Sequence, residues 1–164
     1  QQVGGLGKAH TSWIIECVKP FIDQHYRTSP QKETSFLAGS SLGGLMTAYT
    51  GATYPDVFGV LGIFSLASWV NDEAFLHYIA QHPLATQTKV YLQVGTMEGN
   101  ETDQGFTSKN VNQMYLDSSL WYYQTLLRTG QPIDTIWFRI LADEIHHEKC
   151  WADHFGEFLV SSFQ

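Results

Sequence analysis

The sequence predicts an α/β protein built around a doubly wound parallel sheet, and two patterns indicate it. Short apolar runs, which are typical of buried strands, alternate along the chain with segments of helical periodicity. Strands that alternate with helices form β-α-β crossovers, so the strands are expected to be parallel, with helices on both faces. The 164 residues, of which 43% are hydrophobic, suffice for the core of one domain spanning residues 1–164.

Four strands are expected from runs of aliphatic and aromatic residues. They lie at residues 35–38, 58–65, 89–94 and 135–141. Helices are expected between them at residues 42–53, 72–81 and 111–128. The last of these carries one regular face, formed by Val111, Met114, Tyr115, Ser118, Tyr122 and Leu126, with Gly130 placed to end it.

Two further helices flank this alternating region. A C-terminal helix is predicted by Trp151, Phe155, Phe158 and Leu159 at positions i, i+4, i+7 and i+8. An N-terminal helix over residues 8–26 has a similar stripe, formed by Ile14, Val18, Phe21 and Ile22. Pro20 interrupts this stripe and predicts either a kink or a stop followed by a restart.

Composition excludes several classes of protein. Nine basic and sixteen acidic residues give a net charge of −7, which argues against a nucleic-acid partner. No apolar run approaches the roughly 18 residues that a membrane helix needs. Cys17 and Cys150 do not make a disulfide framework and favour a reducing cytoplasm, although a single disulfide stays open.

The turn after the first expected strand carries the strongest chemical signal. Gly39-Ser-Ser-Leu-Gly43 is a G-x-S-x-G motif between a strand and a helix. A serine in such a sharp turn has a strained backbone, and neighbouring backbone comes so close that both flanking positions are expected to need glycine. Ser41 is therefore the candidate nucleophile, and the Leu42 N–H is placed to bind an oxyanion. Ser40 is the rival within the motif, and an incidental serine in a glycine-rich turn is the alternative.

A serine hydroxyl needs a base, and two of the seven histidines follow the last expected strand. His146 and His147 lie at the same sheet edge as Ser41, so either can serve. A metal site that also uses Glu148 and His154 is disfavoured, because Trp151 stands where an H-E-x-x-H motif would require its second histidine.

The third group of such a site is a carboxylate that orients the imidazole. Glu98, Glu101 and Asp103 follow the third expected strand, at the correct edge and in the correct order. Glu98 is nearest the strand end and is the most rigidly placed of the three. Asp143 and Glu144 are weaker candidates, because they are expected to share the loop of the base.

These motifs together resemble the Putative esterase branch of the α/β-hydrolases, which includes esterase D-like and enterobactin-type siderophore esterases. The resemblance covers nearly the whole chain and rests on residues 39–45, 54–58 leading to 64–69, 94–98 and 146–151. The last segment is similar to the family's His-Asn-Glu-x-x-Trp, with His147 in place of Asn, which implies His146 as the base. The Gly-Thr-x-Glu segment implies Glu98 as the acid.

The resemblance implies a serine carboxyl-ester hydrolase that works through Ser41, His146, Glu98 and an acyl-enzyme, without a cofactor or metal. The substrate would be a small or oligomeric ester, and Trp69 either lines its pocket or is structural. An acyltransferase with the same triad and a non-catalytic binding module of this fold are the alternatives. No large lid is expected between the second and third strands, where residues 69–88 hold one short helix and a turn.

One departure from the family qualifies this interpretation. Such proteins carry several strands before the nucleophile strand, whereas only one helix precedes it here. The expectation is that these residues form the C-terminal portion of an α/β-hydrolase domain. The second oxyanion donor would then lie in a missing N-terminal segment, which belongs to the same chain or is supplied by a partner chain. A homo-oligomer is left open as well.

Overall fold

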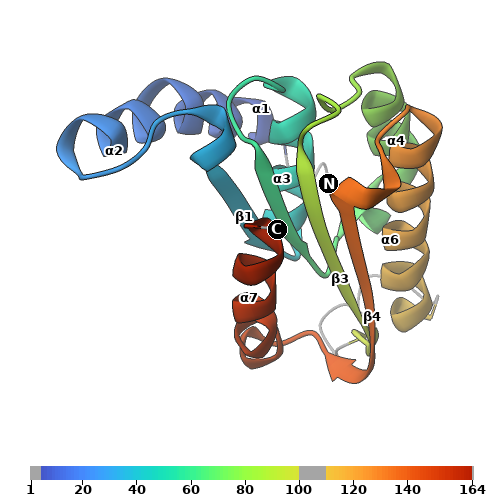
Figure 1. Ribbon diagram of the computed structural model, residues 1–164. Coiled ribbons are helices and arrows are strands. Elements are labelled where there is room, and N and C mark those ends of the chain that lie inside the picture. Colours follow the sequence, from blue (N-terminus) through green and yellow to red (C-terminus); the bar gives the residue numbers. More distant parts are fainter. Residues whose placement is uncertain (1–4, 100–109, 164) are drawn as a thin grey trace.

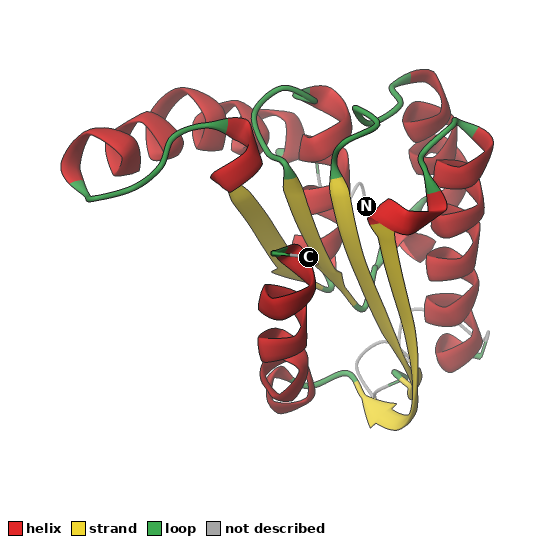
Figure 2. Ribbon diagram, viewed as in Figure 1, coloured by secondary structure: helices red, strands yellow, loops and turns green. Residues whose placement is uncertain are grey.

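The computed structural model describes residues 5–99 and 110–163 and shows a parallel sheet covered by helices (Figures 1 and 2). The sheet has four strands in the order β1-β2-β3-β4, and every neighbouring pair is parallel. The strands are β1 (Phe36–Ser40), β2 (Val60–Phe64), β3 (Lys89–Met97) and β4 (Ile136–Ile145). The predicted fold class is confirmed.

The helices lie on the two faces for a topological reason. Consecutive strands are joined through α3 (Leu42–Thr53), α4 (Asp72–Gln81) and α6 (Val111–Arg128). Because the strand order follows the chain order, crossovers of constant hand place these connecting helices on one face. The C-terminal helix α7 (Glu148–Ser162) covers the opposite face (Figure 1).

The alternation of side chains along β2 supplies both layers of the core. Leu61 and Ile63 are buried in the cluster that includes side chains of α3, α4 and α6. Val60 and Phe64 point the other way and pack against Phe158 of α7. Because β2 is buried on both faces, its sequence is a continuous apolar run rather than an alternation of apolar and polar residues.

Strand boundaries differ from the expected ones, mainly at the carboxyl ends. β1 begins one residue later and continues through Gly39 and Ser40, while β3 runs three residues beyond Val94. β4 continues to Ile145, so Asp143 and Glu144 belong to a strand rather than to a loop. β3 and β4 remain paired beyond a bulge between Gly95 and Met97, and β1 remains paired with β2 through Ser40. Apolar patterning does not predict such backbone pairing.

The N-terminal helix bypasses its proline by local widening. It consists of α1 (Gly7–Trp13), a π-helical turn (Ile14–Val18) and α2 (Lys19–His25), so neither a stop nor a restart occurs. Pro20 has no N–H, and in a regular helix its ring would clash with the carbonyl four residues earlier. The turn before Pro20 is wound more loosely, with the Lys19 N–H bonded to the Ile14 carbonyl.

Two predicted apolar stripes are buried only in part. Phe21 remains 50% exposed at the end of the N-terminal helix, which projects past β1 in Figure 1. On α7, Phe158 is buried, but Phe155 and Leu159 remain 44% and 38% exposed. These side chains fit the helical periodicity, but the described residues cover them only in part.

We expect the 164-residue chain, prepared on its own, to self-associate through β1. This strand lies at an edge of the described sheet, and the exposed Trp13 and Phe21 lie on the neighbouring N-terminal helix. An open apolar edge offers unpaired N–H and carbonyl groups to another strand. Sedimentation should therefore show oligomers, and Ala38→Lys, at an exposed β1 position, should shift them towards monomer. A monomer at every concentration tested would contradict this expectation.

The described residues include no helix that is both long and apolar enough to cross a membrane. Cys17 and Cys150 are both free thiols, so the disulfide that the sequence left open is not formed.

Candidate active site

Ser41 occupies a strained turn between β1 and α3. Its backbone angles, φ 58° and ψ −123°, lie outside the regions that non-glycine residues ordinarily populate. The Ser41 N–H donates to the carbonyl of Phe64 at 2.9 Å, which fixes the turn against β2. Ser40, the rival serine, is the last residue of β1 and pairs with Phe64 in the sheet register. Ser41, and not Ser40, is therefore the serine that occupies the strained turn.

The glycines around Ser41 do not all serve the same purpose. A Cβ at Gly39 would meet the carbonyl group of Gly43 and lie 2.9 Å from Thr47 Oγ1. A Cβ at Gly43 would meet nothing within 4 Å, so the expectation that both flanking glycines must lack a side chain is wrong for Gly43. The second close approach is at Gly44, whose Cβ would lie 3.1 Å from the Phe64 carbonyl oxygen.

Alanine at Gly39 and at Gly43 should therefore act in opposite directions on stability. Gly39→Ala forces overlap with backbone and should destabilise the fold by about 1–3 kcal/mol. Gly43→Ala adds a Cβ in open space within α3 and should be neutral or stabilise by up to about 1 kcal/mol. Urea unfolding of the two variants measures both effects. Equal destabilisation by the two would show that the turn is packed differently.

A buried carboxylate holds the imidazole of His146. Glu98 follows β3 directly and is 1% exposed, and its Oε2 lies 2.7 Å from His146 Nδ1. The other oxygen, Oε1, accepts hydrogen bonds from the Gly95 N–H at 2.7 Å and from the Ser65 hydroxyl at 2.6 Å. Because an ionised carboxylate can only accept, Nδ1 carries the hydrogen and Nε2 is left with a free lone pair.

Gly95 makes this pairing sterically feasible. A Cβ at Gly95 would collide with the carbonyl of Glu144 on β4. The missing side chain lets the end of β4 approach β3 at the bulge, where Met97 pairs with Ile145. His146 follows Ile145 directly, so the bulge delivers it to Glu98.

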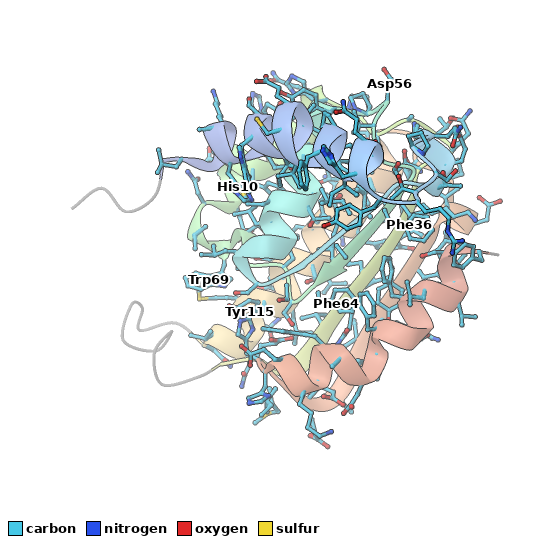
Figure 3. The ribbon with its side chains drawn as sticks, turned by 90° about the vertical axis from the view of Figure 1, so that its left-hand side faces the viewer. His10, Phe36, Asp56, Phe64, Trp69 and Tyr115 are labelled. Atoms are coloured by element: carbon cyan, nitrogen blue, oxygen red, sulfur yellow. The ribbon has the colours of Figure 1, made fainter. Side chains whose placement is uncertain are left out.

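Aromatic rings surround His146. The ring centroid of Tyr115 on α6 lies 4.8 Å from that of His146. The ring of Trp151 on α7 meets His146 edge-on, with 5.0 Å between the centroids. Trp69, in the short helix η3 (Ser68–Val70) after β2, lies edge-on to Tyr115 at 5.8 Å (Figure 3). Sequence reasoning assigned Tyr115 only to a helix face.

Ser65 was also not singled out from the sequence. Ser65 follows β2 directly. Its position after a predicted strand was a usable signal, because the carboxyl ends of parallel strands meet at one edge of the sheet. The hydroxyl of a residue at that position is therefore near the ends of both neighbouring strands.

The remaining candidates lie apart from this pair. His147 is 58% exposed and its Nδ1 accepts from the Lys149 N–H, which caps α7. His154 approaches Glu144 instead, at 3.5 Å. His147 approaches Glu148 at 3.9 Å, but the described residues contain no group of three or more side chains suited to a metal ion. Glu101 and Asp103 lie outside the described residues.

The Cys150 thiol is not arranged as a nucleophile. Its hydrogen bond to the Glu144 carboxylate raises the pKa of the thiol, which disfavours the reactive thiolate.

Ser41 and His146 stand at the carboxyl edge of the same sheet, after β1 and β4 respectively. Within the described part of the chain, no hydrogen bond joins the Ser41 hydroxyl to His146. Catalytic hydrogen bonds are often long in the absence of substrate and tighten in the complex.

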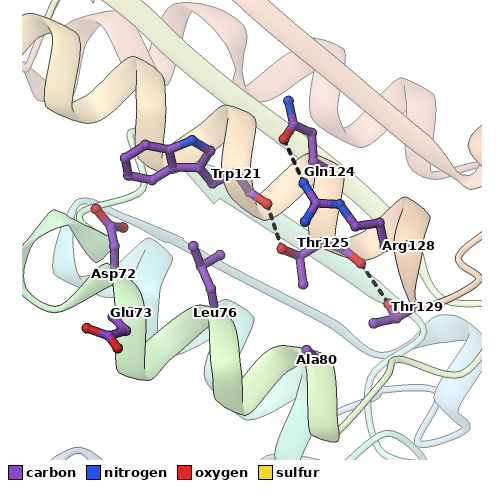
Figure 4. A pocket seen from close by; sticks show the side chains of 9 residues that line it. All are labelled: Asp72, Glu73, Leu76, Ala80, Trp121, Gln124, Thr125, Arg128 and Thr129. Carbon is purple, nitrogen blue, oxygen red and sulfur yellow. Dashed lines mark hydrogen bonds between the residues drawn. The ribbon is translucent and has the colours of Figure 1, made fainter.

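Two surface grooves differ in their distance from this site. One of about 650 Å³ runs between α4 and α6 (Figure 4). It is lined by residues remote from the turn: Asp72, Glu73, Leu76, Ala80, Trp121, Gln124, Thr125, Arg128 and Thr129. Another, of about 350 Å³, lies beside the strained turn and includes Gly39, Leu42 and Gly43 in its wall. The second groove therefore lies next to the turn that holds Ser41.

Comparisons with known proteins agree with this architecture. A protein of Bacillus subtilis strain 168, the uncharacterised YbbA, is 25% identical over 152 residues, which is 93% of this chain and 58% of that protein. The enterobactin esterase of Shigella flexneri superposes with a TM-score of 0.75 at 18% identity, over 99% of this chain and 42% of that one. A ferulic acid esterase from Anaeromyces mucronatus gives 0.67 at 18% identity, over 94% and 55%.

The chain thus spans between about two fifths and three fifths of the length of these relatives. The family model described as "Putative esterase" matches residues 3–124, from the N-terminal helix through most of α6. That match covers well over half of the chain. The chain therefore belongs to the Putative esterase family.

Proposed function

We propose that this chain carries the catalytic centre of a serine carboxyl-ester hydrolase, with Ser41 as nucleophile, His146 as base and Glu98 as acid. The observation that carries the proposal is the 2.7 Å hydrogen bond between Glu98 Oε2 and His146 Nδ1, at the sheet edge where Ser41 occupies its strained turn. A buried carboxylate that orients an imidazole at the same sheet edge as a serine is the arrangement that activates a hydroxyl.

The reaction would proceed in two halves. His146 Nε2 takes the proton of the Ser41 hydroxyl as Oγ attacks the ester carbonyl, and the imidazolium then protonates the leaving alcohol. The resulting acyl-enzyme is cleaved when His146 removes a proton from water and the hydroxide attacks the acyl carbon. The imidazolium then returns this proton to Ser41 Oγ as the carboxylic acid leaves. Glu98 stays ionised throughout and stabilises the imidazolium formed in each half.

Leu42 would supply one oxyanion donor through its backbone. It is the first residue of α3, and the first N–H groups of a helix have no partner within the helix. The positive end of the helix dipole adds to the stabilisation of a developing negative charge.

For the substrate, we propose an ester with an aromatic acyl or alcohol group. Trp69, Tyr115 and His146 form a row of rings, and aromatic rings bind one another through offset or edge-on contacts. The solved relatives named above are esterases of enterobactin and of ferulic acid. In this arrangement Trp69 would contact the substrate and Tyr115 would separate it from the core.

Turnover of an ester panel by the natural full-length protein tests this proposal. Feruloyl and dihydroxybenzoyl esters should be cleaved faster than acetyl and butyryl esters of the same alcohol. A fluorophosphonate probe should label Ser41, as located by peptide mass. If acyl transfer to added alcohols exceeds hydrolysis, the protein is an acyltransferase. If it shows neither turnover nor labelling, it is a binding module.

Among the three candidate acids, loss of the charge at Glu98 should lower kcat the most. Glu98→Gln removes the charge that stabilises the imidazolium and should lower kcat on the order of 10²–10³-fold, less than loss of the nucleophile or base. Glu101→Gln and Asp103→Asn should cost much less. The kcat values of the three variants decide the assignment, and a larger loss in Asp103→Asn would transfer the role to Asp103.

We also propose a reducing compartment, the cytoplasm, for this protein. Cys17 is exposed and Cys150 is half-buried, and both are free thiols, which persist where disulfides do not form.

A further inference from the structure

Ser65 adopts a backbone conformation that costs a serine energy. It follows β2 with φ 51°, in the left-handed region, and its side chain is completely buried. Glycine adopts this conformation without the penalty caused by a Cβ. A serine here offers one thing that glycine does not, a hydroxyl group.

That hydroxyl links two other elements by hydrogen bonds of fixed direction. The indole N–H of Trp151 on α7 donates to Ser65 Oγ at 2.8 Å. Ser65 Oγ in turn donates to Glu98 Oε1 at 2.6 Å. An indole N–H can only donate and an ionised carboxylate can only accept, so the single serine hydrogen must point at Glu98.

We propose that Ser65 is a positioning residue that acts through Glu98, holding Oε1 so that Oε2 faces His146. The Gly95 N–H supplies the second donor to Oε1, and the carboxylate cannot rotate without breaking both bonds. Trp151 contributes in two ways: its N–H bonds to Ser65, and its ring contacts His146 edge-on. This inference rests on the proposed function, in which Glu98 orients the base.

The hydroxyl has an electrostatic effect besides its geometric one. A donor to a carboxylate favours the ionised form, so its removal makes the coupled Glu98 and His146 pair hold a proton more tightly. The titration midpoint of His146 should then move to higher pH. Of the other described titratable groups, Tyr115 faces His146 from α6, and the exposed His147 and Glu148 follow it in sequence, at the N-cap and first position of α7.

The test compares Ser65→Gly with Ser119→Ala in the full-length protein. Ser65→Gly removes the hydroxyl and relieves the backbone strain, so loss of folding is not the expected result. Ser119 is a matched control, because it is also completely buried and its hydroxyl has no partner in the described part of the chain. Proton NMR follows the titration of His146, whose signal is assigned by its loss in His146→Gln.

We expect the His146 midpoint to rise by about half a pH unit or more in Ser65→Gly and to stay in place in Ser119→Ala. On a cleavable ester, Ser65→Gly should lower kcat roughly 10–100-fold with little change in KM. Trp151→Phe should act in the same direction. Added to Ser65→Gly, it should lower kcat by less than it does in the wild type, because part of its effect passes through the missing hydroxyl.

Each failure has a distinct meaning. An unmoved midpoint in folded Ser65→Gly overturns the inference, and if that variant does not fold, an unmoved midpoint in Trp151→Phe overturns it instead. The NMR measurement needs no turnover. If the midpoint moves while the wild-type protein cleaves no ester, the role of Ser65 towards Glu98 stands and the proposed function fails.

Discussion

Replacing Ser41 with alanine is expected to lower kcat/KM for ester hydrolysis roughly 10⁴-fold or more. The hydroxyl is the only group lost, and it is the proposed nucleophile, placed by the strained turn at the start of α3. The measurement is initial rates on the fastest ester of the panel, with protein concentration verified by absorbance.

Ser40→Ala is the matched control for this variant. Ser40 is the neighbouring serine, but it pairs within the sheet and does not occupy the turn. It should retain most of the activity. A Ser41→Ala protein with near-full esterase activity would remove the serine mechanism, whatever the behaviour of Ser40→Ala.

Replacing His146 with alanine should cost about as much as replacing Ser41, because without a base the hydroxyl is a poor nucleophile. His147→Ala should have little effect on kcat. His147 accepts the Lys149 N–H at the start of α7, so its loss should instead destabilise the protein by about 1 kcal/mol. Kinetics and urea unfolding of both variants separate the two roles.

The pH dependence offers an independent check on His146. Only the neutral imidazole accepts the Ser41 proton, so kcat should rise with pH over the range in which histidine side chains in general lose their proton. The chemical step must be rate-limiting for this measurement. Equal losses in His146→Ala and His147→Ala, or a flat profile over that range, would contradict the assignment of His146.

The family resemblance and the fold were accessible from the sequence because both depend on local patterns. Helices α3, α4 and α6 have the predicted bounds, since their periodicity and caps lie within each segment. Gly130 ends α6 with the expected positive φ, and its N–H and that of Gln131 bond back to Leu127 and Leu126. The strained turn at Ser41 followed from the same local reasoning.

The strand ends and the exposed stripes were less predictable, because they depend on contacts distant in sequence. Whether β4 continues through Glu144 is decided by its pairing with β3, more than 40 residues earlier. Whether Phe155 is buried depends on which surface lies opposite α7, and helical periodicity does not name that surface.

The sequence by itself determined the parallel sheet, the serine turn and the sheet edge at which candidate groups gather. The alternation of strands with helices and the residues of the turn can both be recognised along the chain without knowledge of distant contacts. Only the tertiary structure decided which groups meet. It brought Glu98 to His146, directed His147 to a helix cap, and joined Trp151 to Ser65 across the sheet edge. The physical reason is that a hydrogen bond requires two atoms within about 3 Å, and residues dozens of positions apart reach that distance only through packing of the whole sheet and its helices.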